Sequence, residues 1–85
     1  MEQIKDKFEA AVLESKQISM KPSNETLLQL YGLYKQSVVG DINTEPPGSF
    51  DFVNKAKYEA WSALKGKTSE ESMQQYVDLV NKLKG

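Results

Sequence analysis

The chain has 85 residues, eleven lysines against twelve carboxylates, and no cysteine, histidine or arginine. A domain of this size buries roughly 60 to 65 per cent of its unfolded surface, which predicts a single domain over residues 1–85 with one small core and any ligand in a surface groove. The balanced charge disfavours a nucleic-acid partner, and the missing residue types exclude disulfides, ordinary zinc or haem sites and the serine–histidine pair of hydrolases, so no metal is expected.

Apolar spacing predicts the first two helices. The first is expected over about residues 3 to 16, where apolar side chains recur every three or four positions. Pro22 interrupts this pattern, because a proline disfavours helical geometry in the residue before it. Ser23 can then cap a second helix that runs to about Val39 and stops at Gly40.

Two more helices are predicted after a loop. Residues 41 to 50 contain two prolines and a glycine and should lack regular structure. Asp51 can cap a third helix over about residues 52 to 64, and Thr68 and Glu71 fit a capping box that starts a fourth helix near the C-terminus. Because each helix has a single apolar stripe, the four must shield one another. We therefore predict an all-α four-helix bundle.

The second predicted helix carries two tyrosines and a lysine on one side. Tyr31, Tyr34 and Lys35 are three and four positions apart, so the two rings and the ammonium group should converge on one patch. Taken alone, tyrosines at this spacing more often mark the edge of a core, and a single lysine is more often a solvated charge. As a binding patch, the group would suit a flat, anionic ligand.

The segment from Leu30 to Asn43, LYGLYKQSVVGDIN, resembles the central signature of the acyl-CoA-binding protein family. Further matches follow in the family's order and spacing: Pro47-Gly48, Asp51-Phe52, KAKYEAW from Lys55 to Trp61, Leu64-Lys-Gly66 and Tyr76-Val77. The resemblance covers essentially the whole chain. It implies a soluble, non-catalytic carrier that binds long-chain fatty acyl-CoA thioesters in a groove across an up-down-down-up bundle, a helix order that periodicity does not predict.

The resemblance also implies roles for residues at matching positions. Tyr31, Lys35 and Lys57 would hold the 3′-phosphate of the CoA ribose, and Tyr34 would lie against the adenine. These side chain types suit CoA, because an aromatic ring that stacks on a base contributes about 1 to 3 kcal/mol in nucleic-acid systems. A lysine–phosphate contact adds a charge-assisted hydrogen bond. The ligand role is therefore expected for all four residues.

Two further positions match the family and two depart from it. Lys16 and Tyr76 match the remaining head-group contacts. Tyr58 stands where the family commonly has tryptophan, which keeps an aromatic wall of smaller area. Val53 stands where a lysine that helps to bind CoA is often found, which removes a possible phosphate contact. The resemblance with these departures predicts a head-group affinity below the family's usual level.

The acyl chain should supply most of the affinity, because each buried methylene contributes about 0.8 kcal/mol and fourteen would give on the order of 11 kcal/mol. The tyrosines and lysines would then select a CoA ester over a free fatty acid. Leu27 and Leu28, one turn before Tyr31, are the preferred acyl contacts. The other apolar candidates are interpreted as interhelical core: Phe8, Leu30, Trp61, Val77 and Val80.

Two other function classes stay open. A helical protein–protein interaction module could use the same patch and groove for a peptide. An enzyme such as a thioesterase is the weaker alternative, because Ser37, Ser62 and Thr68 have no histidine to activate them. We therefore expect no catalytic residue and no cofactor. The polar N-terminus and the lack of an 18-residue apolar run predict a cytoplasmic protein without stable membrane insertion, and a monomer is expected.

Overall fold

The computed structural model describes residues 3–18 and 21–84. Within these ranges the regular structure consists of four helices, which confirms the all-α prediction. The helices are α1 (Ile4–Ser15), α2 (Asn24–Val38), α3 (Phe52–Ser62) and α4 (Ser69–Lys84). The third helix ends two residues before the predicted boundary, because the chain tightens into turns in which the amides of Leu64 and Lys65 bond to carbonyls three positions back. No helix in the described ranges is long and apolar enough to cross a membrane.

The predicted helix caps are confirmed. The Ser23 side chain accepts a hydrogen bond from the Thr26 amide at 3.1 Å, and the Asp51 carboxylate accepts one from the Asn54 amide at 3.3 Å. At the start of α4, the Thr68 hydroxyl oxygen accepts from the Glu71 amide at 3.1 Å while the Glu71 carboxylate accepts from the Thr68 amide at 3.4 Å. Each cap satisfies amides that the first helical turn leaves without a partner.

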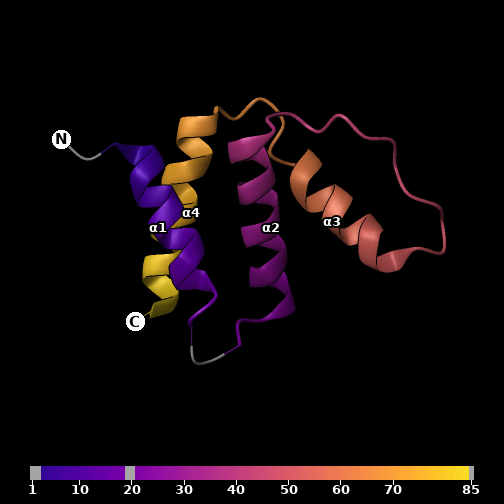
Figure 1. The fold of residues 1–85 in the computed structure, drawn as a ribbon. Helices are drawn as coiled ribbons and strands as arrows, with labels where there is room; N and C mark the ends of the chain where they lie inside the picture. Colours follow the sequence, from indigo (N-terminus) through magenta and orange to yellow (C-terminus); the bar gives the residue numbers. More distant parts are fainter. Residues whose placement is uncertain (1–2, 19–20, 85) are drawn as a thin grey trace.

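The helices form an up-down-down-up bundle. Figure 1 shows α1 and α4 running in one direction, while α2 and α3 run in the other. The parallel course of α2 and α3 requires a long return connection, and residues 39–51 supply it because an extended chain covers more than twice the length of a helix per residue. This connection sweeps away from α1 and α4 and returns to the start of α3 (Figure 1).

The hydrophobic core lies between α1, α2 and α4. Its buried members come from all three of these helices, and none comes from α3. They are Phe8, Ala11, Leu30, Leu33, Tyr76, Val77 and Val80. Phe8, Leu30, Val77 and Val80 are therefore core residues, as predicted from their spacing.

The third helix packs on α2 through a close approach of backbone to backbone. Gly32 faces the Ala60 carbonyl, and a Cβ added at Gly32 would lie 2.7 Å from the Ala60 oxygen. That distance is shorter than any ordinary carbon–oxygen contact, so only glycine fits here. Helix α3 makes its helix contacts with α2 and none with α1 or α4. Gly32 therefore allows α3 to lie closer to α2 than any other residue at this position would.

Candidate ligand site

Two lysines and three aromatic residues line a surface cavity of about 350 Å³ between α2, α3 and the connection that joins them. We call it the lysine cavity. Its lining combines α2, the return connection and α3: Tyr31, Lys35, Ile42, Thr44, Glu45, Pro47, Asn54, Lys57, Tyr58 and Trp61. The structure thus brings Tyr31, Lys35 and Lys57 together with Tyr58, as the resemblance implied. Val53 does not line this cavity, and its side chain is exposed.

The two ammonium groups in the lysine cavity share one aromatic ring. Lys35 Nζ lies 6.0 Å from the centroid of Tyr31, and Lys57 Nζ lies 5.5 Å from the same ring. The described residues place no carboxylate within 4.0 Å of either nitrogen. Ring quadrupoles attract both cations only modestly, and the two like charges repel each other. An anion held between them would relieve this repulsion.

Trp61 places its ring near the Lys35 ammonium group. Its ring centroid lies 5.6 Å from Lys35 Nζ, and its indole N–H donates a hydrogen bond of 2.8 Å to the Gly40 carbonyl. Gly40 has a φ of +99°, a conformation that glycine adopts without strain. Trp61 is buried as predicted, but it lies at the lysine cavity and outside the α1–α2–α4 core. Its four-residue spacing from Lys57 is the sequence signal for this role.

A second cavity of about 360 Å³ lies on the other side of Tyr31. We call it the tyrosine cavity. Its lining comes from α1, α2, α4 and the residues that flank α1 and α2: Val12, Ser15, Lys16, Pro22, Leu27, Leu30, Tyr31, Tyr34 and Tyr76. Five predicted ligand contacts meet here, namely Lys16, Leu27, Tyr31, Tyr34 and Tyr76. Because Tyr31 lines both cavities, one ligand can extend from one to the other.

The rings of the tyrosine cavity are held by an aromatic cluster. Phe8 stacks against Tyr34 with centroids 6.0 Å apart and packs edge-on against Tyr76 at 5.1 Å. The Tyr76 hydroxyl donates to the Ser15 hydroxyl oxygen at 3.2 Å. Tyr76 is buried, whereas 39% of Tyr34 remains exposed. Tyr34 therefore offers a supported flat face to a planar ligand.

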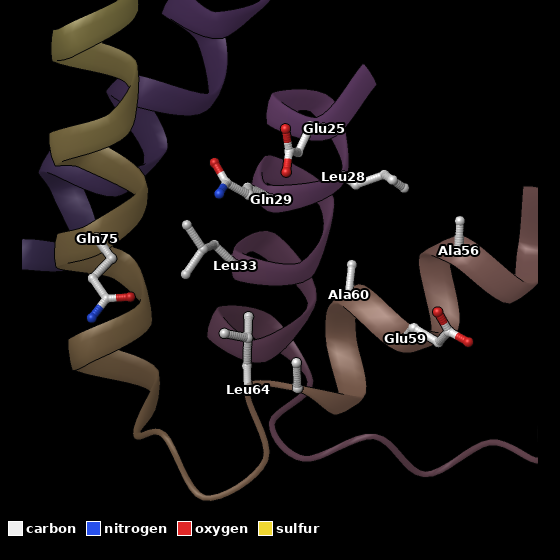
Figure 2. Close-up of a pocket in the computed structure, with 10 residues that line it drawn as sticks. Glu25, Leu28, Gln29, Leu33, Ala56, Glu59, Ala60, Leu64 and Gln75 are labelled. Atoms are coloured by element: carbon white, nitrogen blue, oxygen red, sulfur yellow. The ribbon is translucent and has the colours of Figure 1, made fainter. Parts of the chain in front are cut away.

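The third hollow is an apolar groove of about 660 Å³ on the α3–α4 side of α2, and its side chains are drawn in Figure 2. Leu28 points from α2 toward α3, where Ala56 and Ala60 face the same space (Figure 2). Carboxylates and amides of Glu25, Gln29, Glu59 and Gln75 form its polar edge. The groove has apolar walls that suit a hydrocarbon chain.

The structure separates the two leucines that were predicted as acyl contacts. Leu27 lines the tyrosine cavity and Leu28 lines the apolar groove, because consecutive residues of a helix point about 100° apart. The two residues predicted as acyl contacts therefore face different hollows. Of the two, Leu28 faces the larger hollow.

A hydrogen-bonded network that the sequence did not reveal ties the end of α2 to the α3–α4 connection. The side-chain nitrogen Nε2 of buried Gln36 donates to Asp41 Oδ1 at 2.8 Å and to the Lys67 backbone carbonyl at 2.9 Å. The Gly66 amide also donates to Asp41 Oδ1, at 2.8 Å. These bonds, from Gly66 first and Gln36 second, lower the pKa of Asp41. The network thereby joins the start of the return connection to the segment between α3 and α4.

Comparison with known proteins identifies the family. The sequence model described as "Acyl CoA binding protein" matches residues 5–80, which is nearly the entire chain. The chain belongs to this family. An acyl-CoA-binding protein of Brassica napus is 44% identical over 94% of this chain and 87% of its own length. An acyl-CoA-binding protein homolog of Drosophila melanogaster is 44% identical over 94% of this chain and 93% of its own.

Solved structures of acyl-CoA-binding proteins share the fold. The crystal structure of acyl-CoA-binding protein 2 from Oryza sativa superposes with a TM-score of 0.91 at 40% identity, covering 95% of this chain and 90% of that one. The protein from Moniliophthora perniciosa superposes with a TM-score of 0.88 at 35% identity, over 93% of this chain and 78% of that one. The four-helix bundle is therefore the family's fold.

Proposed function

We propose that this chain is a non-catalytic carrier that binds medium- to long-chain fatty acyl-CoA thioesters. The observation that carries the proposal is the pair of ammonium groups of Lys35 and Lys57, brought from two helices to one tyrosine ring without a carboxylate partner among the described residues. Such a pair is suited to a phosphate. Membership of the acyl-CoA-binding family supports CoA as the molecule that carries it.

The 3′-phosphate of CoA would lie in the lysine cavity. Lys35 and Lys57 would each donate a charge-assisted hydrogen bond, and the Tyr31 hydroxyl would add a neutral donor. Because the lysines stand on α2 and α3, the phosphate would also bridge the two helices. Tyr58 would close one wall of this cavity with less area than a tryptophan.

The adenine would lie in the tyrosine cavity. The exposed ring of Tyr34 offers the stacking surface, and Lys16 at the cavity edge would face the negative charge of the head group. Tyr76 is buried and bonded to Ser15, so its main effect would be to shape the wall. Leu27 would contact the purine side of the ligand and not the acyl chain, which revises the role expected from its sequence position.

The acyl chain would lie in the apolar groove. Leu28, one turn before Tyr31, and Ala56, next to Lys57 in the sequence, would contact the chain. Its volume of about 660 Å³ falls in the usual range for small-molecule sites, about 300 to 1,000 Å³. A groove open to solvent can accept chains of several lengths, because the chain end need not fit a closed pocket.

The affinity of such a carrier would divide between the two parts of the ligand. Burial of the chain supplies the larger share against water, at about 0.8 kcal/mol per methylene. A membrane or micelle covers the same chain equally well, so the preference for the protein over a membrane would depend on the head-group contacts. The head group would also distinguish the thioester from a free fatty acid.

Calorimetric titration tests this proposal. The protein is titrated with a long-chain acyl-CoA below its micelle concentration, with free CoA and with the corresponding fatty acid. We expect the thioester to bind far more tightly than either part alone, because both the groove and the cavities are then filled. Binding of a peptide with no heat from the thioester would favour the interaction module, which family membership does not favour.

We also propose that the chain acts as a cytoplasmic monomer without a cofactor and without turning its ligand over. The lack of histidine and cysteine supports the absence of hydrolysis, because no ordinary base is present to activate a serine. Incubation of purified protein with acyl-CoA, followed by a free-thiol assay, should show no release above the buffer rate. Sustained thiol release would contradict the carrier.

A further inference from the structure

Three large apolar side chains are exposed together where the return connection meets α3. The exposed fraction is 90% for Phe50, 72% for Phe52 and 68% for Val53. We call these three residues the apolar tip. None of them belongs to the hydrophobic core, and none lines the lysine cavity or the apolar groove. They lie at the end of the return connection, which forms the outer edge of the molecule on the side away from α1 (Figure 1).

The apolar tip continues the lining of the apolar groove. Phe52, Ala56 and Ala60 are spaced four residues apart on α3, so they follow one another along one side of the helix. Ala56 and Ala60 line the groove, and Phe52 extends the same stripe to the first turn of α3. An apolar path therefore leads from the inside of the groove to the exposed tip.

The charges beside the tip are few and of both signs. Asp51 caps α3 by accepting from the Asn54 amide and side chain, and Lys55 is the nearest lysine along the chain. The described residues show no basic cluster here that would draw the tip to an anionic surface. Any partner must therefore be bound mainly through the apolar side chains, with little dependence on salt.

The area of the tip helps to decide the partner. Three side chains of this size and exposure offer on the order of 400 Å² of surface. A stable protein interface needs about 800 Å² on each partner, so a second copy of the chain or a folded protein would be held poorly. A lipid interface needs no complementary shape, and a few aromatic side chains at its polar–apolar boundary suffice for reversible binding.

We propose that the apolar tip docks the protein reversibly on a lipid bilayer, with Phe50 and Phe52 at the boundary between head groups and acyl chains. Docking in this way places the outer end of the apolar groove against the bilayer. An acyl chain could then pass along Phe52 to Ala56 and Ala60 without crossing water. This route for the chain rests on the proposed carrier function, whereas the docking itself does not.

Flotation with phosphatidylcholine vesicles, in the absence of acyl-CoA, tests the docking. The double variant Phe50→Ser/Phe52→Ser should bind vesicles at least about tenfold more weakly than the unaltered chain. The matched control is Leu13→Ser on α1, since Leu13 is 63% exposed and lies outside the tip. Vesicle binding of the control should be unchanged, and raised salt should leave all three values nearly unchanged. Equal vesicle binding by the double variant and the unaltered chain would overturn the proposal.

A gain of signal provides an independent measurement. In Phe50→Trp, the new tryptophan should shift its emission to the blue on addition of vesicles and be quenched by brominated lipid, while Leu13→Trp should show neither change. Absence of both changes in Phe50→Trp would overturn the docking. Sedimentation tests the remaining alternative, in which the tip binds a second copy of the chain. If the unaltered chain is a dimer and the double variant is a monomer, the tip is a dimer contact and the docking proposal is overturned. None of these results depends on whether the acyl-CoA titration succeeds.

Discussion

The two sides of helix α2 serve different purposes. Toward α1 and α4, α2 contributes Leu30 and Leu33 to a closed core with side chains from all three helices. Toward α3, it presents Gly32 to a carbonyl and surrounds that contact with cavities. One side packs a continuous apolar core beside the tyrosine cavity, and the other keeps the lysine cavity and the apolar groove open.

This difference shows how so short a chain can fold and still bind a large ligand. A domain of this size has few apolar side chains to bury, so its core comes from three helices, and α3 is attached to α2 alone among the helices. The attachment of α3 depends on Gly32, on the Trp61 hydrogen bond and on the Gln36–Asp41 network. Substitutions on the two sides of α2 should therefore affect different measurements.

The largest effect is expected in the core. Phe8→Ala should lower the free energy of unfolding by about 3 to 5 kcal/mol, because it leaves a cavity beneath Tyr34 and Tyr76. Urea denaturation followed by circular dichroism measures this change. Leu13→Ala on the same helix is the control and should cost less than about 0.5 kcal/mol, since Leu13 is exposed. Similar losses in both variants would contradict the assignment of the core.

The next largest effect is expected in ligand binding. Lys35→Ala should weaken acyl-CoA binding by about 1.5 to 3 kcal/mol, the range for a hydrogen bond to a charged group. The free energy of unfolding should hardly change, because Lys35 has no carboxylate partner to lose among the described residues. Calorimetry and urea denaturation on the same samples separate the two quantities.

The control for this prediction is Lys55→Ala, which makes the same change of charge on α3 outside the lysine cavity. It should leave the affinity nearly unaltered. Lys57→Ala should weaken binding as Lys35→Ala does, and the double variant should lose less than the sum, because the two ammonium groups would share one phosphate. Strict additivity would place the two lysines on separate parts of the ligand.

An intermediate effect on both measurements is expected at the contact between α2 and α3. Gly32→Ala brings a methyl group into the Ala60 carbonyl, so α3 must shift or the overlap must be relieved. We expect a loss of about 1 to 3 kcal/mol in stability and weaker acyl-CoA binding, because Lys57 moves relative to Lys35. The control is Gly48→Ala, which adds the same methyl group where nothing lies within 4 Å and should change neither quantity much. Unchanged binding in Gly32→Ala would show that the lysine pair tolerates a moved α3.

The parts of the fold that depend on nearby residues were predictable from the sequence. Ser23, Asp51 and the Thr68–Glu71 pair cap helices through bonds to residues three positions away, and these patterns are visible in the chain itself. The up-down-down-up order was not accessible in this way. It followed only from the resemblance to the family, because periodicity does not state which helices are neighbours.

The residues of the site were predictable from the sequence, but the hollow that each of them lines was not. The resemblance placed Tyr31, Lys35 and Lys57 together, and the structure brings them to one cavity. Leu27 and Leu28 were both predicted as acyl contacts, and the packing of the other helices around α2 puts them in different hollows. Gln36 escaped notice because its partner Lys67 is 31 positions away, a distance over which no local pattern operates.

The smallest effect is expected from protonation of Asp41, which tests whether the Gln36–Asp41 network stabilises the α3 side of the molecule. Its hydrogen bonds lower the pKa of Asp41 in the folded state, so the folded protein favours the ionised carboxylate. The stabilisation is therefore present above the unfolded pKa of about 3.9 and is lost as the pH falls through the lower folded value. The isosteric variant Asp41→Asn should be less stable than the unaltered chain at pH 6.

The pH dependence distinguishes charge from shape at Asp41. As the pH falls below 4, the stability difference between the unaltered chain and Asp41→Asn should shrink toward zero, because protonation removes the same charge that the amide replaces. Thermal unfolding of both proteins at a series of pH values measures this convergence. A difference that persists at pH 2 would mean that the amide disturbs the bonds from Gly66 and Gln36 through its shape. In that case the attachment of α3 would depend on the geometry of the network and not on its charge.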